Sequence, residues 1–367
     1  MHKITFYPLG NADSSLIELE NGQNILFDYA HVKCSEDEED LRIDLKTNIL
    51  EKMEEKGKDN FDVVAFSHAD EDHYQGFSDI LFLKHANKYQ EGFRLKINEL
   101  WIPAAVVVET GLKSEGKILQ AEARHRIKEK TGIKVFSRPE ALKDWFDKEG
   151  LDINHFRHLF VDAGKLVPGF NIDENNVEIF VHSPFAIIED SKHVDRNLNS
   201  IVVQFTFSVN AQITRVIMSA DTHYGNWQSI VNITKNKNRS ERLNWDIFKI
   251  PHHCSYNSLG PEKGSTKTIP VEEVSWLLEQ GNNRLKIIST SNPIKNEESD
   301  QPPHFQAKNC YKDFTGIKDG EFLVTMEFPR EASPQPLEIE IDESGASTIK
   351  RNIGSAVLIS KPARRAG

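Results

Sequence analysis

The sequence predicts an α/β fold, and three observations lead to that prediction. Short apolar segments of strand length alternate with longer segments whose apolar residues recur at helical spacing. The 367 residues, 38% of them hydrophobic and 28% charged, suit a globular chain with one large α/β domain or two ordinary ones. A cluster of His and Asp residues directly follows an apolar strand, which is where α/β proteins place their functional side chains.

The chain opens with three predicted strands in residues 3–30, and the turn between the last two is an Asn-Gly hairpin signal at Asn21-Gly22. An acidic segment over residues 35–60 carries apolar residues at helical spacing and predicts a helix. The apolar strand FDVVAFS, residues 61–67, leads into the His/Asp cluster. Residues 72–88 are typical of the start of another helix.

The rest of the chain continues to alternate strands and helices. Residues from about 77 to 180 are less periodic, and we expect them to form an insertion around the same core. The further elements predicted are strands at 97–105, 175–184, 199–209, 213–221, 246–253 and 285–291, with helices at 113–132, 138–150, from about 226, and at 271–281. The tail has strand patterns at 321–328, 337–342 and 354–360 and predicts a small antiparallel β appendage with a basic end.

Composition restricts the chemistry. No signal peptide precedes the first strand and no apolar run approaches the roughly 18 residues of a membrane span, so we expect a cytoplasmic protein without a membrane partner. Cys34, Cys254 and Cys310 are widely spaced and odd in number, so any metal must be held by His and carboxylate side chains. The formal net charge of -11 argues against a broad phosphate-binding surface, although a metal centre can still recruit an anionic substrate.

The His/Asp cluster lies in the segment AFSHADEDHYQG, which places His68, Asp70, Asp72 and His73 within six residues. Imidazole nitrogen and carboxylate oxygen together match zinc, manganese or iron. The alternative is a solvated acidic turn. The position at the carboxyl end of an apolar strand favours the metal site.

HADEDH resembles the HxHxDH signature of the metallo-β-lactamase fold hydrolases, with Asp70 in place of the second histidine. That variant is the form found in the ComEC-type branch, the hydrolase domains associated with DNA uptake and their free-standing relatives. Further segments resemble the family's motifs in the same order from about Ile4 to His304, namely GNADSS, FDYA, VHSP, NLNS, MSAD, FKIPHHCS and SDQPPHF. The resemblance does not extend to residues 77–180 or to the tail after His304.

This resemblance implies a four-layer αββα sandwich, in which two mixed β-sheets pack face to face between helices. It also implies a division of the chain into a hydrolase domain over residues 1–304, with a helical insertion at about 77–180, and a small β-rich extension over residues 305–367.

The resemblance further implies a site for two metal ions. The expected ligands are His68, Asp70 and His182 for the first metal and Asp72, His73 and His253 for the second, with Asp221 bridging both. For His182 the alternative is a capped strand-end histidine, because the ComEC-type branch often uses other groups at that position.

Neighbours on a strand face opposite ways, so we expect only one of His252 and His253 to be a ligand. His253 is preferred because PHHC overlays the family's PGHG with the second histidine in register, which leaves His252 to contact phosphate or donate a proton. His304 matches a late Gly-His-Pro motif and is either a surface histidine or a substrate-side group. Asp72, His252 and His304 are the candidates for catalytic roles, and Lys249 is interpreted as a strand-edge charge.

The expected cofactors are two divalent metal ions, zinc or manganese, and the carboxylate of Asp70 shifts the preference toward manganese. A water bridging such ions loses a proton near neutral pH and attacks a phosphodiester whose oxygens the cations bind. The leading hypothesis is therefore a phosphodiesterase or nuclease acting on DNA or another nucleic acid. One alternative is hydrolysis of a small phosphodiester, such as a cyclic nucleotide or a phosphorylcholine ester. The other is a non-catalytic, metal-containing interaction module that contacts a protein partner through the insertion or the extension.

Overall fold

The fold is that of a computed structural model, which describes residues 1–185, 196 and 199–349. The predicted strand at 354–360 and the basic end of the chain lie outside the described residues. In the part that is described, no helix combines the length and the apolar character needed to cross a membrane.

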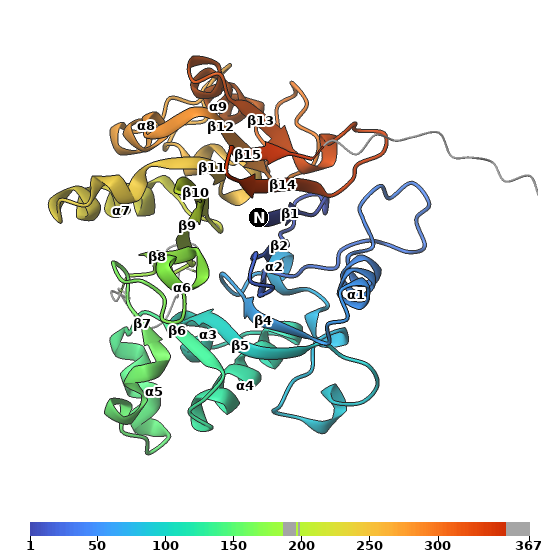
Figure 1. Ribbon diagram of the computed structural model, residues 1–367, viewed down its shortest axis with the longest axis vertical. Coiled ribbons are helices and arrows are strands. Elements are labelled where there is room, and N and C mark those ends of the chain that lie inside the picture. The colour runs from blue at the N-terminus through green and yellow to red at the C-terminus, as the bar shows by residue number, and fades with distance from the viewer. Residues whose placement is uncertain (186–195, 197–198, 350–367) are drawn as a thin grey trace, which may run out of the picture.

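Two β-sheets form the centre of the molecule (Figure 1). Within the described residues the first sheet has nine strands in the order β15-β14-β1-β2-β3-β4-β5-β6-β7, and the second has six in the order β13-β12-β11-β10-β9-β8. The strands of the first sheet are β1 (His2–Phe6), β2 (Ser15–Glu18), β3 (Asn24–Phe27), β4 (Asn60–Ala65), β5 (Lys96–Pro103), β6 (Ile133–Phe136), β7 (Phe160–Val161), β14 (Leu337–Asp342) and β15 (Gly345–Thr348). Those of the second are β8 (Val177–Ser183), β9 (Val202–Val209), β10 (Gln212–Met218), β11 (Trp245–Lys249), β12 (Gly281–Ser289) and β13 (Glu321–Val324).

Longer helices cover the outer faces of both sheets, with α1 (Leu45–Glu55), α3 (Ala104–Val108), α4 (Ser114–Lys128) and α5 (Glu140–Lys148) on the first and α7 (Tyr224–Asn236), α8 (Glu272–Glu279) and α9 (Phe305–Ile317) on the second (Figure 1). The single-turn helices α2 (Glu71–Tyr74) and α6 (Ile172–Asn175) belong to the loops between strands. Helix α1 begins where its sequence provides a cap, because the Asp44 side chain accepts a hydrogen bond from the Thr47 backbone N–H at 2.9 Å.

The apolar side chains sort into three clusters, which define four layers. In β4, Val63 and Ala65 point into the cluster between the two sheets, whereas Val64 points outward and packs with Ile49 of α1. On the far side, Trp227 of α7 and side chains of α8 and α9 pack on the second sheet. The predicted four-layer αββα sandwich is confirmed.

Parallel pairing brings several loops to the carboxyl ends of neighbouring strands. In the first sheet Phe27 of β3 is in register with Ala65 of β4, and in the second Met218 of β10 is in register with Lys249 of β11. Strand β12 continues the parallel order beside β11. The loops that follow these strands are therefore the ones that can build a common site.

Two local predictions were wrong. The helix expected over residues 72–88 is the single turn α2, because Gly76 adopts a left-handed conformation with φ +76° that ends it. The tail was expected to be an antiparallel appendage, but β13 pairs parallel with β12 while β14 pairs antiparallel with β1. Helix α9, which lies between β12 and β13 in the chain, was not predicted. The domain boundary at residue 304 stays a prediction.

Candidate metal centre

The first part of the site is built by the loops after β3 and β4. Asp28 directly follows β3 with φ +57°, a left-handed conformation that Asp tolerates better than most residues. Its carboxylate accepts hydrogen bonds from the Ser67 backbone N–H and hydroxyl, both at 2.7 Å, and from His73 Nδ1 at 2.9 Å. Because a carboxylate only accepts, Nδ1 of His73 carries the proton. This leaves the Nε2 atom of His73 for the centre of the site.

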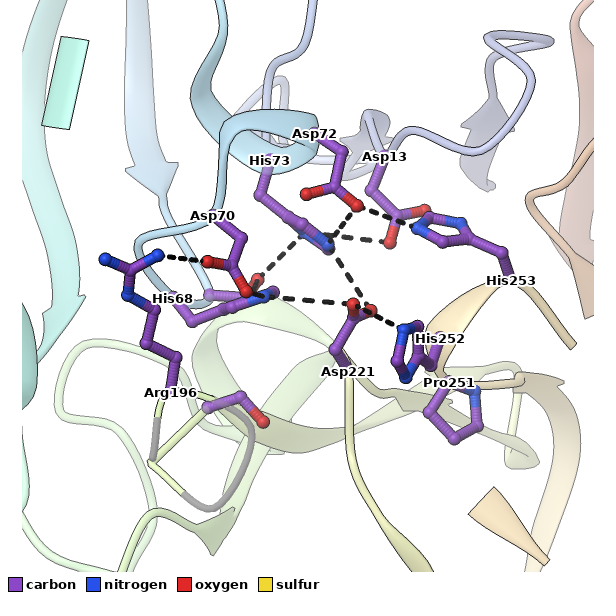
Figure 2. A network of polar contacts seen from close by, with 12 residues as sticks. Asp13, His68, Asp70, Asp72, His73, Arg196, Asp221, Pro251, His252 and His253 are labelled. Carbon is purple, nitrogen blue, oxygen red and sulfur yellow. Dashed lines mark hydrogen bonds and ion pairs between the residues drawn. The ribbon is translucent and has the colours of Figure 1, made fainter. Parts of the chain in front are cut away.

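Asp70 precedes helix α2 and contacts two groups of opposite character (Figure 2). Its Oδ2 lies 3.2 Å from His68 Nε2, and its Oδ1 pairs with the guanidinium of Arg196. Arg196 also donates to Glu109 Oε1, with an Nε to oxygen distance of 2.8 Å. One oxygen of Asp70 is thus directed to the predicted ligand His68 while the other is held by a cation.

Asp221, three residues beyond β10, lies at the centre of the cluster (Figure 2). Its Oδ1 is 3.4 Å from His73 Nε2, whereas its Oδ2 is 4.0 Å from His68 Nε2 and 3.7 Å from His252 Nε2. The two oxygens of one carboxylate therefore face two different groups of histidines.

His252 and His253 both face the cluster, and the expectation that only one would do so was wrong. Strand β11 ends at Lys249, and His252, His253 and Cys254 then adopt left-handed conformations with φ between 50° and 66°. The alternation of side chains along a strand does not apply to such a turn. His253 Nε2 lies 3.0 Å from Asp72 Oδ2, and its Nδ1 donates to the carbonyl of Thr290, just beyond β12, at 2.7 Å.

Asp13 and Lys249 belong to the same site, although the sequence reading assigned neither of them to it. Lys249 is buried rather than a strand-edge charge, and its ammonium pairs with Asp13 and donates to the carbonyl of Ser219 at 2.9 Å. Asp13 is also 3.7 Å from His73 Nδ1. The signals available were an aspartate in GNADSS, in the loop between the first two strands, and a lysine inside an apolar strand.

The residues fit a divalent cation. Ligand atoms of Asp13, His73, Asp221 and His253 all lie within 4.8 Å of one another, and all four residues are buried. Several buried polar atoms here have no hydrogen-bond partner in the described part of the chain, namely Asp13 Oδ1, His68 Nε2, His73 Nε2 and Asp221 Oδ1. Polar atoms buried in this way are rarely left without a partner, and imidazole and carboxylate atoms are good zinc and manganese ligands.

Opposite charges dominate the protonation of the cluster. Burial by itself would raise the pKa of Asp221, but neighbouring histidines, His73 foremost, hold that pKa well below its usual range. Burial would likewise lower the pKa of His73 and of His253, but carboxylates, including Asp72 and Asp221 in both cases, raise both above the usual value. The carboxylates therefore favour protonation of these histidines, and a bound cation would compete with those protons.

His182 does not contact this cluster, and His304 lies beside it, where its backbone N–H donates to the Cys254 carbonyl at 3.1 Å and its ring is close enough to His252 to affect its protonation. His182 is the last residue but one of β8, the edge strand of the second sheet, and its ring packs edge-on against Phe180 with centroids 5.0 Å apart. His304 precedes α9, where its Nδ1 accepts from the Tyr256 backbone N–H at 3.4 Å. Among the described residues no hydrogen bond or ion pair joins either histidine to Asp221, His68 or His73.

No protein-family model and no curated protein matches the chain. It is similar to several solved structures at low identity. A long form RNase Z from yeast is 14% identical, with 88% of this chain and 40% of that chain covered and a TM-score of 0.39. A metal-dependent hydrolase of the β-lactamase superfamily is 10% identical over 94% of this chain and 100% of its own, with a TM-score of 0.39. A diphosphatase from the PhnP family is 8% identical, with 88% of this chain and 87% of that chain covered and a TM-score of 0.34.

Proposed function

We propose that the protein is a dinuclear metal-dependent hydrolase of phosphodiesters. The observation that supports this most is the orientation of Asp221, whose two oxygens face separate groups of histidines. A carboxylate placed in this way is suited to bridge two cations. His68, Asp70 and His252 would complete one metal site, and Asp72, His73 and His253 the other, with Asp13 beside the second. His182 is not part of this proposed ligand set.

The partial exposure of the site supports a catalytic rather than a structural metal centre. Asp70 and Asp72 are 33% and 32% exposed and His252 is 25% exposed, while His73 and Asp221 are buried. Structural zinc sites are usually closed and rich in cysteine, whereas catalytic sites keep a position open to solvent. Here the buried ligands would fix the ions and the exposed side would admit a substrate.

When bound, divalent cations would supply Lewis acidity and lower the pKa of water. The protein's own residues would position these ions and determine the side from which a substrate reaches them. Asp28 orients His73, and the Thr290 carbonyl orients His253, so the ring nitrogens that face the centre are fixed before any ion binds. Arg196, held by Asp70 and Glu109, places a cation at the half-exposed edge where an anionic substrate would enter.

The charge of the site makes binding of an anion depend on the metals. The carboxylates that converge here are Asp13, Asp28, Asp70, Asp72 and Asp221, against two permanent cations, Lys249 and Arg196. Lys249 is fully engaged by Asp13, so it contributes little to recruiting a substrate. Two divalent ions would reverse the local charge and thereby allow a phosphodiester to approach.

A cavity on the loop that carries Asp13 supports a small phosphodiester as the second candidate substrate. It has a volume of about 540 Å³, and its lining includes Asn11, Asn292 and more acidic side chains than basic ones, namely Asp37, Glu39, Asp40 and Glu331 against Arg42. Asn11 precedes Asp13 by two residues and accepts a hydrogen bond from the Asn292 backbone N–H at 3.0 Å. Acidic walls repel a long polyanion more than a substrate with a single phosphate.

The test measures hydrolysis of bis-p-nitrophenyl phosphate, linear and circular DNA, and RNA with manganese, magnesium or zinc. We expect hydrolysis of at least one substrate by the wild type and a loss of about 100-fold or more in Asp72→Ala and Asp221→Ala. Asp144→Ala, which removes an exposed carboxylate from α5, is the matched control and should keep full activity.

Activity on the small ester alone would favour the small-substrate candidate, and cleavage of DNA or RNA would favour the nuclease. If the two site variants match the wild type on every substrate, the proposed hydrolase is wrong. If the wild type binds metal but hydrolyses none of these substrates, the proposed phosphodiester hydrolysis is wrong.

A further inference from the structure

A second cavity, separate from the metal centre, lies between β8, helix α7 and the turn before the second sheet. Its volume is about 310 Å³, within the range of roughly 300 to 1,000 Å³ typical of small-molecule sites. Its lining includes Phe180, His182 and Ile230 and the basic side chains of Lys165, Lys237 and Arg239. None of the proposed metal ligands lines it.

The inner part of this cavity contains a polar group whose bonding capacity is not fully used. His182 is only 3% exposed; its ring interacts with the backbone of Arg242, but neither ring nitrogen makes a hydrogen bond of ordinary geometry with a described residue. Burial lowers the pKa of His182 to about 3, so the ring is neutral and offers one donor and one acceptor. The walls around it are apolar, with Phe180 in contact with the imidazole ring and Ile230 on the opposite helix.

The rim of the cavity is basic. Lys165, Lys237 and Arg239 are all exposed, and none of them takes part in an ion pair within the described part of the chain. Arg239 uses one N–H to donate to the Gly164 carbonyl at 3.1 Å. Three unpaired cations around one opening contrast with the net charge of -11 of the whole chain.

We propose that this cavity binds a small organic anion with an apolar body and one hydrogen-bonding group at its inner end. The carboxylate or phosphate of the ligand pairs with the cations of the rim, its body packs against Phe180 and Ile230, and its inner polar group bonds His182. This role accounts for a buried histidine that the proposed hydrolysis does not use. The metal centre and this cavity are independent, so the proposal stands whatever the metal centre hydrolyses.

The test uses isothermal titration calorimetry on the metal-loaded full chain. The first probe, 3-(4-hydroxyphenyl)propionate, has all three features of the ligand. 3-Phenylpropionate lacks the inner hydroxyl, and 3-(4-hydroxyphenyl)propionamide lacks the charge. 2-(4-Hydroxyphenyl)ethylphosphonate replaces the carboxylate and distinguishes the two kinds of anionic head. Metal content and thermal unfolding of each variant establish that it is folded.

We expect one molecule of the first probe or of its phosphonate analogue to bind per chain, with a Kd below about 1 mM. For the wild type, 3-phenylpropionate, which lacks the hydroxyl, should bind about five- to tenfold more weakly than the first probe. For His182→Leu the two probes should bind with the same Kd. Replacing the carboxylate of the probe by the amide should raise the Kd for Lys237→Gln by a smaller factor than it raises the Kd for the wild type. Lys235→Gln is the matched control, because this lysine of the same helix packs over the Trp276 ring at 3.9 Å instead of lining the cavity.

Three results would overturn the proposal. The first is the absence of saturable binding for every probe, and the second is equal weakening by Lys235→Gln and Lys237→Gln. The third is unchanged binding in both His182→Leu and Lys237→Gln. Should His182→Leu fail to fold, the surface variant Lys237→Gln still decides, because it changes only an exposed side chain.

Discussion

Lys249 and Asp13 form a buried ion pair at the base of the metal centre, with both side chains only 2% exposed. A charge removed from water in this way is costly unless its partner and its remaining hydrogen bonds are present. The Ser219 carbonyl accepts one further hydrogen bond from the ammonium. The lysine thus allows a carboxylate to lie beside the histidines without accumulating unbalanced negative charge.

Removing the lysine alone should therefore be strongly destabilising. We expect Lys249→Met to lower the free energy of unfolding by about 3–5 kcal/mol, because it leaves Asp13 buried and unpaired. Urea unfolding followed by circular dichroism measures the change. The double variant Asp13→Asn/Lys249→Met should recover most of the loss. A Lys249→Met protein as stable as the wild type would show that the ion pair does not contribute this much to the free energy of unfolding.

The raised pKa values of His73 and His253 predict that metal binding depends on pH. Both imidazoles hold protons in the metal-free protein to a pH above their ordinary value of 6.5, so a cation must displace them. Apparent affinity should therefore rise as the pH increases above about 6.5, and the number of protons released on binding should fall only once the pH exceeds the raised pKa values. Calorimetry in buffers of different ionisation enthalpy measures both. Affinity independent of pH would contradict this protonation state.

At the scale of single elements, the turn after β11 determines which histidines can act as ligands. We expect His252→Ala and His253→Ala each to reduce the metal content of the purified protein, because both side chains face Asp221 or Asp72. His182→Leu should leave the metal content unchanged, since β8 is an edge strand removed from the cluster. Inductively coupled plasma mass spectrometry gives the content. Loss of metal in His182→Leu would restore the ligand role implied by the motif resemblance.

The elements after residue 304 also matter for stability. β13 pairs with β12 and β14 with β1, and the buried side chains of Leu337 and Ile339 contribute to the cluster between the sheets. A chain truncated after His304 should therefore lose the cooperative unfolding transition of the full chain, as followed by circular dichroism on heating. A truncated chain that unfolds like the full one would support an independent domain over residues 1–304.

On the scale of the whole molecule, the sequence was informative where the signal was local. The spacing of HADEDH and the apolar strand before it located His68, Asp70, Asp72 and His73, and the structure brings these side chains together. The apolar run FDVVAFS also predicted the strand β4. Both depend on residues that are close neighbours in the chain.

The features that could not be predicted from the sequence depend on contacts between residues that are far apart in the chain. Asp13 and Lys249 are 236 residues apart, and no local pattern relates them. His182 lies in a correctly predicted strand, but the sequence pattern does not show that this strand is at the edge of the second sheet. The left-handed turn over His252, His253 and Cys254 was likewise not predicted, because three successive non-glycine residues in that conformation are rare and no local sequence pattern indicates it.

The central claim is that one buried carboxylate organises two metal ions, and metal stoichiometry tests it most directly. Purified full chain should be dialysed with manganese or zinc, freed of excess ion and measured by mass spectrometry beside Asp221→Ala and the control Asp144→Ala. We predict two ions per chain in the wild type and in the control, and one or none in Asp221→Ala. A wild type that retains no metal, or an Asp221→Ala protein that retains two ions, would contradict the account.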